Sequence, residues 1–297
     1  MSIVGVSTPI LLAALGELVA EKSGVLNLGV EGMMLIGAVA GFAATYLTGS
    51  PWLGIVAAAA FATLASLMFG YLTLSLTSNQ VATGLALTIF GISLSSLVGE
   101  SFVGLTVPIF GPVFPEALSA DPVLRVLFGH SPIVYFSLVM TFAVWWFLKN
   151  TRGGLILRAV GENDYSAHSI GYSVIAVRYA AVAFGGAMAG IAGSFYSMVL
   201  TPMWAEQLTA GRGWIALALV VFSVWRPIRL FFGAYLFGIV MTLELQSKAS
   251  GYNLFAPEFM AALPYLATIV VLALISLRKS GATAAPACLG RPFKPAT

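Results

Sequence analysis

The stretch WLGIVAAAAFATLASLMFGYLTLSL, residues 52–76, contains no Asp, Glu, Lys, Arg or His. About 20 apolar residues in a helix are enough to span the hydrocarbon core of a bilayer, so this stretch alone predicts a transmembrane helix. Similar apolar runs without such a residue occur at 80–99, 179–200 and 261–277. Their continuous apolar character argues against a transmembrane β-barrel, whose strands alternate apolar and polar residues.

The composition of the whole chain supports the same conclusion. Of its 297 residues, 59% are hydrophobic and 8% are charged, and the mean hydropathy is +0.97. So few charged side chains cannot cover a soluble globular protein of this size, and a bilayer must act as the solvent. The single cysteine, Cys288, excludes a disulfide framework within the chain. We therefore expect an all-α polytopic membrane protein.

The apolar runs, taken in order, predict about nine transmembrane helices. They fall roughly at residues 3–20, 30–48, 52–77, 80–99, 133–148, 177–200, 213–225, 229–247 and 261–277. Lys and Arg cluster after the fifth, seventh and ninth runs, and such residues favour the cytoplasmic side of a membrane. This pattern predicts an N-terminus outside and a C-terminus in the cytoplasm.

The crossings form one expected transmembrane domain, residues 1–279. It contains a proline-rich extracytoplasmic loop at 100–132 and a charged cytoplasmic loop at 149–178. Residues 280–297 are expected to be a flexible cytoplasmic tail. The sequence has no soluble catalytic domain and no glycine-lysine nucleotide loop, so ATP hydrolysis would belong to another subunit.

Two apolar segments, one in each half of the chain, are short or interrupted. The first is expected to break around Gly16–Glu17, and in the seventh only residues 214–225 are cleanly apolar. Because non-helical backbone is tolerated in a membrane only where protein or water satisfies it, paired irregular segments point to a transport pathway. The sequence shows no strict internal repeat, and a diverged structural repeat is a hypothesis that rests on the general habit of transporter folds. Small-xxx-small spacing, which permits close helix crossing, occurs in two glycine pairs: Gly37 with Gly41 and Gly186 with Gly190.

The segment LGELVAEKSGVLNLGVEGMMLIGAVAG, residues 15–41, places polar groups among glycines in an apolar region. Charge inside a membrane is costly and usually serves a function. Asn27 and Glu31 are therefore candidates for a pathway wall that hydrogen-bonds a polyhydroxylated solute. The alternative is structural, with Glu31 favoured by the dipole of its own helix and with Glu21 and Lys22 in a hydrated loop.

The charged loop at 149–178 is longer than a connection requires. Residues Leu155–Val160 and Asp164–Ile170 are predicted to form two short helices, with Gly161 as the stop of the first. A hairpin of this kind could dock into a groove on a partner protein, whereas an ordinary charged loop would only anchor the topology. His168 alone indicates neither catalysis nor a metal.

These segments resemble the permease subunits of ABC importers for nucleosides and simple sugars, in the wider group of branched-chain amino acid and ribose-like permeases. The resemblance is carried by EKSGVLNLGVEGMM at 21–34, Asn79–Gln80 with GLAL at 84–87, LRAVGEN at 157–163, Trp225, Pro227 and GAYLFG at 233–238. The chain departs from the family pattern at Asp164, Ser166, Tyr172, Ser223, Arg226 and Arg229.

The resemblance implies a non-catalytic permease in a bacterial cytoplasmic membrane. Its partners would be a second permease, two ATP-binding subunits, an extracytoplasmic substrate-binding lipoprotein and membrane lipid, with no nucleic acid. ATP and Mg would bind only to the ATPases, and this chain would hold no cofactor or metal. Residues 149–178 would be the loop that couples to the ATPase, through Arg158, Gly161, Glu162, Asn163 and Gly171.

A nucleoside presents a planar base and several hydroxyl groups, which hydrogen bonding and stacking would recognise together. The candidate pathway residues are Asn27, Glu31, Asn79, Gln80, Phe90, Trp204 and Glu206. The aromatic members could equally pack in the core or at the membrane interface. Sugars and nucleosides are not separated by these residues.

Two other classes of membrane protein share part of this pattern. A secondary transporter driven by an ion gradient would share the broken segments, but residues 52–99 and 179–200 hold no carboxylate for proton coupling. Sodium coupling through backbone carbonyls remains open. A membrane enzyme would need a buried catalytic pair or metal cluster, and His130 and His168 lie in predicted loops on opposite sides. No catalytic residue is assigned.

Overall fold

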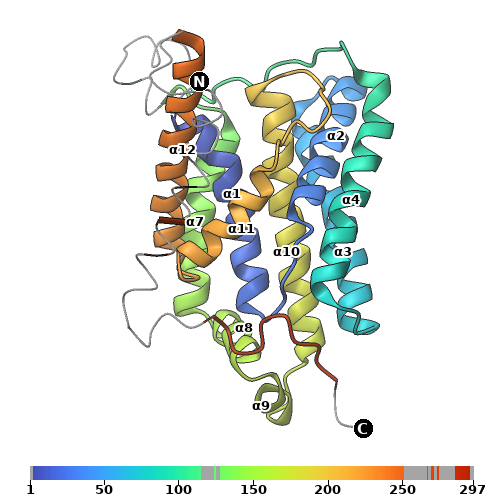
Figure 1. Ribbon diagram of the computed structural model, residues 1–297, viewed down its shortest axis with the longest axis vertical. Coiled ribbons are helices and arrows are strands. Elements are labelled where there is room, and N and C mark those ends of the chain that lie inside the picture. The colour runs from blue at the N-terminus through green and yellow to red at the C-terminus, as the bar shows by residue number, and fades with distance from the viewer. Residues whose placement is uncertain are drawn as a thin grey trace.

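A computed structural model of the chain describes residues 3–114, 128–250 and 285–294, and positions 124, 266, 269, 270 and 273. In this part the protein is a helical bundle without a β-sheet (Figure 1). The helices are α1 (Ile3–Lys22), α2 (Val30–Thr48), α3 (Pro51–Gly70), α4 (Gln80–Gly99), α7 (Pro132–Asn150), α8 (Arg152–Glu162), α9 (Asp164–Ser169), α10 (Val174–Phe195), α11 (Arg212–Phe222) and α12 (Pro227–Ser250). Tyr71–Ser75 and Tyr196–Leu200 extend α3 and α10 as π-helical turns, and Glu100–Phe102 extends α4 as a 3-10 turn.

The predicted all-α polytopic membrane architecture is confirmed. In the described residues, seven helical spans are long and apolar enough to cross a membrane, and they match seven of the predicted segments. The segment predicted at 213–225 is the short helix α11, which ends at Phe222. The segment predicted at 261–277 lies mostly outside the described residues.

Helix α1 lies inside the bundle, and all its residues from Gly5 to Glu21 are buried. It packs against α10, α12, α11 and α7. The predicted interruption at Gly16–Glu17 is wrong, because α1 is continuous through both residues. Gly16 lies directly against Gly185 and Met188 of α10, and the Glu17 carboxylate accepts a hydrogen bond from the backbone N–H of Asn27. Tertiary contacts thus satisfy residues that seemed to break the helix.

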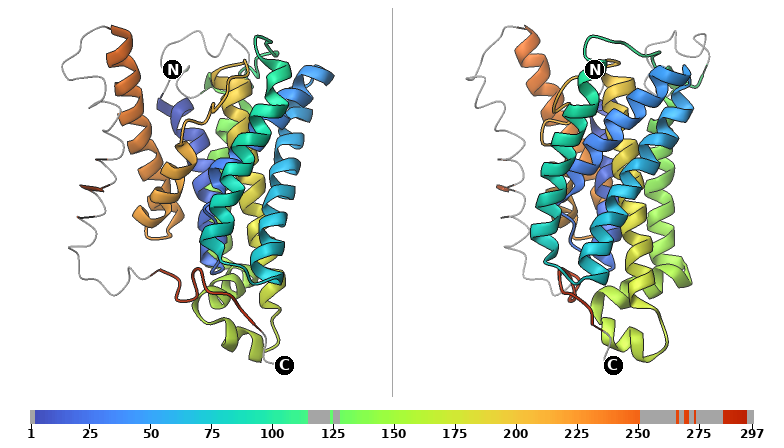
Figure 2. Two further views of the ribbon diagram at one scale, coloured as in Figure 1. Left: turned by 45° about the vertical axis from the view of Figure 1, so that its right-hand side comes forward. Right: turned by 90° about the vertical axis from the view of Figure 1, so that its right-hand side faces the viewer.

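Two helices, α2 and α11, begin inside the bundle. Residues 23–29 run back from the end of α1 to α2, and residues 201–211 turn back from the end of α10 to α11 (Figures 1 and 2). The predicted pair of irregular segments is therefore present, although the first follows α1 instead of interrupting it. Because α1 and α10 run in opposite directions, the arrangement agrees with a diverged inverted repeat.

The helices α8 and α9 form a hairpin, residues 152–169, at one end of the bundle (Figure 1). The two predicted short helices are confirmed. The predicted stop at Gly161 is wrong: Gly161 lies inside α8, which ends at Glu162. The Asn163 side chain then accepts a hydrogen bond from the backbone N–H of Ser166 and caps α9.

Close contact between α2 and α10 depends on glycine. A Cβ atom built on Gly37 would collide with the backbone of Gly190, and one on Gly193 would collide with the carbonyl oxygen of Met34. Since these helices are packed backbone to backbone, a side chain can enter only if the helices separate. The predicted pair Gly37 and Gly41 marks this contact, whereas Cβ atoms on the other predicted pair, Gly186 and Gly190, would meet Ser66 and Ala58 of α3.

We expect Gly37→Ala to lower the free energy of unfolding by about 1–3 kcal/mol, because the added methyl group overpacks the contact between α2 and α10. Thermal unfolding of the purified protein in detergent measures this loss. The control is Gly111→Ala, since nothing lies within 4 Å of a Cβ atom at Gly111. Equal stability of the two variants would contradict the packing described above.

Candidate functional site

The carboxylate of Glu31 joins the two helices that begin inside the bundle. Glu31 lies in the first turn of α2 and is 5% exposed. Its carboxylate accepts hydrogen bonds from the Thr209 hydroxyl at 2.5 Å, the Gly211 N–H at 2.8 Å and the Gly213 N–H at 2.6 Å. A carboxylate in this position satisfies the free N–H groups at the start of α11 and interacts favourably with its dipole.

The start of α2, the start of α11 and residues 23–29 together are called the junction below. Asn27 shapes it from within: its side-chain oxygen accepts a hydrogen bond from the Gly29 N–H at 2.8 Å. Gln80 holds it from α4, where its side-chain oxygen accepts from the Leu26 N–H at 2.8 Å. The structure therefore brings three predicted pathway residues together, each with a hydrogen bond to irregular backbone.

Two further carboxylates, both in α1, hold irregular backbone in place. Glu17 accepts the N–H of Asn27 at 3.1 Å, which ties residues 23–29 to α1. Glu21 accepts the indole N–H of Trp225 at 2.5 Å, which ties the turn between α11 and α12 to the end of α1. The buried carboxylates of the N-terminal segment thus anchor non-helical backbone, where helix hydrogen bonds are missing.

The other four predicted pathway residues make none of the hydrogen bonds that hold the junction. Asn79 is exposed and caps α4 by accepting the Ala82 N–H at 3.0 Å. Phe90 and Glu206 are exposed, Phe90 with 47% of its surface accessible. Trp204 is buried in a small apolar cluster with Phe42 and Val107.

The hairpin is fastened to the bundle by a buried ion pair. Arg178 of α10 is 1% exposed and lies 3.0 Å from the carboxylate of Asp164 at the start of α9. Its guanidinium also donates to the carbonyl oxygen of Ser23 at 3.1 Å and to that of Arg291 at 3.3 Å. One side chain therefore links the hairpin to the junction and to the C-terminal residues.

Residues 285–294, called the C-terminal strap, pack across the hairpin. The Cys288 N–H donates to the Gly161 carbonyl at 2.9 Å, and the Gly290 N–H donates to the Gly24 carbonyl at 3.0 Å. The buried Phe293 ring makes edge-to-face contacts with the rings of Tyr165 and His168. The expectation of a flexible tail from residue 280 does not hold for this part, because backbone hydrogen bonds and an aromatic cluster fix it.

The coupling candidates differ in their surroundings. Gly161 is buried, and a Cβ atom there would collide with the carbonyl oxygen of Lys22, so α8 touches the end of α1 directly. Arg158, Glu162 and Asn163 are exposed on the hairpin. Gly171 follows α9 with φ of +93°, a conformation that favours glycine. Beside it the exposed side chains of Tyr165, Ile170 and Tyr172 give the hairpin an apolar tip.

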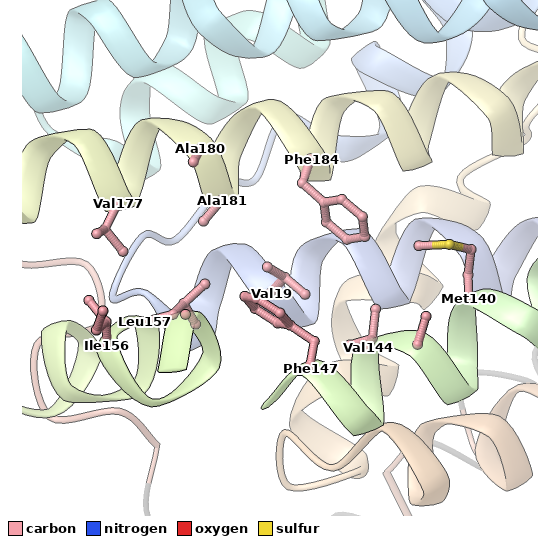
Figure 3. Close-up of a pocket in the computed structure, with 12 residues that line it drawn as sticks. Val19, Met140, Val144, Phe147, Ile156, Leu157, Val177, Ala180, Ala181 and Phe184 are labelled. Atoms are coloured by element: carbon pink, nitrogen blue, oxygen red, sulfur yellow. The ribbon is translucent and has the colours of Figure 1, made fainter. Parts of the chain in front are cut away.

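A cavity of about 470 Å³ lies between α1, α7, α8 and α10 (Figure 3). Its walls are apolar, formed by side chains such as Val19, Phe147, Leu157 and Phe184. Such walls give a sugar or nucleoside no hydrogen-bond partner, so this cavity does not fit a polar solute. In the described part of the chain, no group of three or more His, Cys, Asp or Glu could hold a metal ion.

Sequence patterns did not predict several residues of this site. Thr209, Gly211 and Gly213 are 178 to 182 positions from the Glu31 that they contact. No local pattern links residues at that separation. Arg178 could have been singled out from the sequence, because it is a basic residue directly before an uncharged apolar run.

Comparisons with known proteins agree with this architecture. Residues 1–276 match the family described as branched-chain amino acid transport system / permease component. One relative is TsgC13 of Haloferax volcanii, provisionally named a glucose ABC transporter permease protein. It is 39% identical over 92% of this chain and 89% of its own length. The nucleoside ABC transporter permease protein NupC of Lactococcus lactis is 30% identical over 90% of this chain and 89% of its own.

The guanosine ABC transporter permease protein NupQ of Bacillus subtilis is also 30% identical, over 90% of this chain and 88% of its own. No solved structure matches the chain. The family match spans nearly all the described helices, including the junction and the hairpin, and several relatives align along most of their length. The chain belongs to the family of branched-chain amino acid transport system permease components.

Proposed function

We propose that the chain is the membrane-spanning permease of an ATP-driven importer, and that its solute is a nucleoside or a simple sugar. The relatives named for glucose, nucleosides and guanosine support this solute class. The observation that carries the transport mechanism is the direct contact between the hairpin and the junction, where Gly161 of α8 lies against the end of α1 and against the backbone nitrogen of Gly24.

That contact gives motion of the hairpin a route to the junction. Arg178 binds both Asp164 of the hairpin and the carbonyl of Ser23 at the start of the irregular segment. The same segment continues into α2, where Glu31 holds the start of α11. A displacement of the hairpin would therefore be passed to α2 and α11, the two helices that begin inside the bundle, which is what alternating access at a fixed site requires.

The partners follow from this role. A second permease, two ATP-binding subunits and an extracytoplasmic substrate-binding lipoprotein would complete the importer, with ATP and Mg²⁺ on the ATP-binding subunits only. The hairpin end would face the cytoplasm of a bacterium, and the C-terminal strap lies at the same end (Figure 1). The exposed apolar tip formed by Tyr165, Ile170 and Tyr172 would enter a groove on the ATP-binding subunit.

The solute would pass along the junction. Two predicted pathway residues, Trp204 and Gln80, have a buried side-chain nitrogen without a hydrogen-bond partner in the described residues, and of these Gln80 contacts the junction. This donor is available to a solute hydroxyl or base edge, whereas the carboxylate of Glu31 is occupied by three donors. Asn27 and Glu31 would set the shape of the junction. Contacts of Asn79, Phe90, Trp204 and Glu206 with solute stay predictions.

Charge reversal on the exposed face of the hairpin tests the proposed coupling. We expect Arg158→Glu with Glu162→Arg to reduce ATP-dependent uptake by about tenfold or more without lowering thermal stability, because both side chains are exposed. Uptake into vesicles that contain all subunits measures the effect. Glu100→Arg, an exposed position at the opposite end, is the control and should keep uptake. Unchanged uptake in the reversed variant would refute coupling through this face.

A further inference from the structure

A second cavity, of about 590 Å³, lies between the ends of α1 and α7, helix α8 and the turn from α11 to α12. None of the residues that line it is acidic. Five are cationic: Lys22, Lys149, Arg158, Arg226 and Arg229. We call it the basic pocket. Four separate segments of the chain bring these charges together, so the cluster is a product of the fold and not of a basic run in the sequence.

The cations of the basic pocket lack carboxylate partners. In the described part of the chain, the one ion pair joins Arg178 to Asp164, and neither residue lines this pocket. Glu162 is near enough to Lys22 to attract it, but Arg158 and Arg226 are also near enough to repel it. A concave site lined by one sign of charge concentrates ions of the opposite sign. The pocket is thus suited to an anion.

The basic pocket lies beside a surface suited to lipid chains. Trp145 and Trp225 line it, and the Lys149 ammonium lies 5.2 Å from the centre of the Trp145 ring. Tryptophan is typical of the level of lipid headgroups. From Ile228 at the pocket, exposed apolar side chains continue along α12 at Phe232 and Leu236. Acyl chains along this face would place a headgroup at the cations.

A constrained turn presents two of the cations. Val224 and Trp225 both have positive φ, +54° and +52°, which is uncommon for a β-branched or bulky residue. The hydrogen bond from the Trp225 indole to Glu21 helps to hold this backbone. Arg226 follows directly and Arg229 lies in the first turn of α12. Backbone strain of this kind clusters at ligand sites.

We propose that the basic pocket binds the phosphate headgroup of an anionic membrane phospholipid. The unpaired cations supply the charge complementarity, and the partly exposed Trp145 and the apolar face of α12 place the site at the membrane boundary. Basic pockets between helices at this level suit such headgroups. This location favours a lipid over an acidic segment of a partner protein. The proposal does not depend on the transported solute. Because Arg158 also belongs to the proposed coupling face, the test changes only Arg226 and Arg229, which lie outside the hairpin.

The test uses the purified, delipidated full-length chain in neutral detergent, titrated with phosphatidylglycerol, phosphatidylcholine or inorganic phosphate, with the thermal midpoint as the readout. Phosphatidylglycerol should raise the midpoint more than phosphatidylcholine. We expect Arg226→Asn with Arg229→Gln to weaken the apparent affinity for phosphatidylglycerol by about 30-fold, because each basic residue near an anionic lipid contributes roughly fivefold. Both side chains are exposed, so the variant should fold.

The matched control removes two exposed cations from the same end of the bundle but outside the pocket, with Arg152→Gln and Lys294→Gln. It should bind phosphatidylglycerol like the unmodified chain, and inorganic phosphate alone should not reproduce the stabilisation. Full lipid affinity in the Arg226 and Arg229 variant would overturn the proposal. Equal protection by inorganic phosphate would overturn it as well.

Discussion

Replacement of Glu31 by Ala is expected to lower the free energy of unfolding by about 3–5 kcal/mol and to abolish uptake. The change removes the acceptor of three hydrogen bonds and leaves the donors of Thr209, Gly211 and Gly213 inside the protein without a partner. It also separates α2 from the start of α11. Thermal unfolding in detergent and uptake by the assembled transporter, measured on the same preparation, give the two values.

Glu31→Gln should have an intermediate effect of about 1–3 kcal/mol, because the amide keeps one acceptor oxygen but turns an N–H group towards a donor. The exposed carboxylate at Glu206 gives the matched control, and Glu206→Gln should leave stability unchanged. If Glu31→Ala kept full stability and only uptake were lost, the structural role of Glu31 would be refuted and direct contact with the solute would be favoured.

Arg178→Met is expected to cost a similar amount, about 3–5 kcal/mol, because it leaves the buried carboxylate of Asp164 without its counter-ion. It also removes the donors to the Ser23 and Arg291 carbonyls, so the hairpin loses its link to the junction and to the strap. Thermal unfolding measures the first effect. Hydrogen exchange in residues 152–169 measures the release of the hairpin.

Adding Asp164→Asn to Arg178→Met should restore about 1–3 kcal/mol, because no uncompensated charge then remains. Arg152→Met, which removes an exposed arginine from the same hairpin, serves as the control. Equal stability of the Arg178 and Arg152 variants would show that the ion pair does not hold the hairpin. A double variant no more stable than Arg178→Met would contradict the cause given for the loss.

Local signals in the sequence predicted the elements that depend on local interactions. The apolar runs placed seven membrane spans, and the charged loop between 149 and 178 was correctly divided into two short helices. Capping by Thr151 and Asn163 and the positive φ of Gly171 fix the hairpin within a few residues of chain. Patterns of this length are visible in the sequence.

Features that depend on distant residues were not predictable in the same way. Glu17 seemed to break α1 because its partner, the Asn27 backbone, was unknown. The C-terminal strap seemed flexible from its composition, but it is held by backbone hydrogen bonds to Gly161 and Gly24, which leave no hydrophobic pattern. Glu31 was correctly selected as a special residue, but its contact with α11 appears only when the two halves of the chain are folded together.

The central claim is that this chain is the permease of an ATP-driven importer. The most direct measurement is uptake of radiolabelled nucleosides and simple sugars into vesicles that contain the chain, with and without its partner subunits and internal ATP. We predict uptake only when the partners and ATP are both present, and loss of that uptake when the charges of Arg158 and Glu162 are reversed. Uptake by the chain alone, driven by an ion gradient, would contradict the account and identify a secondary transporter.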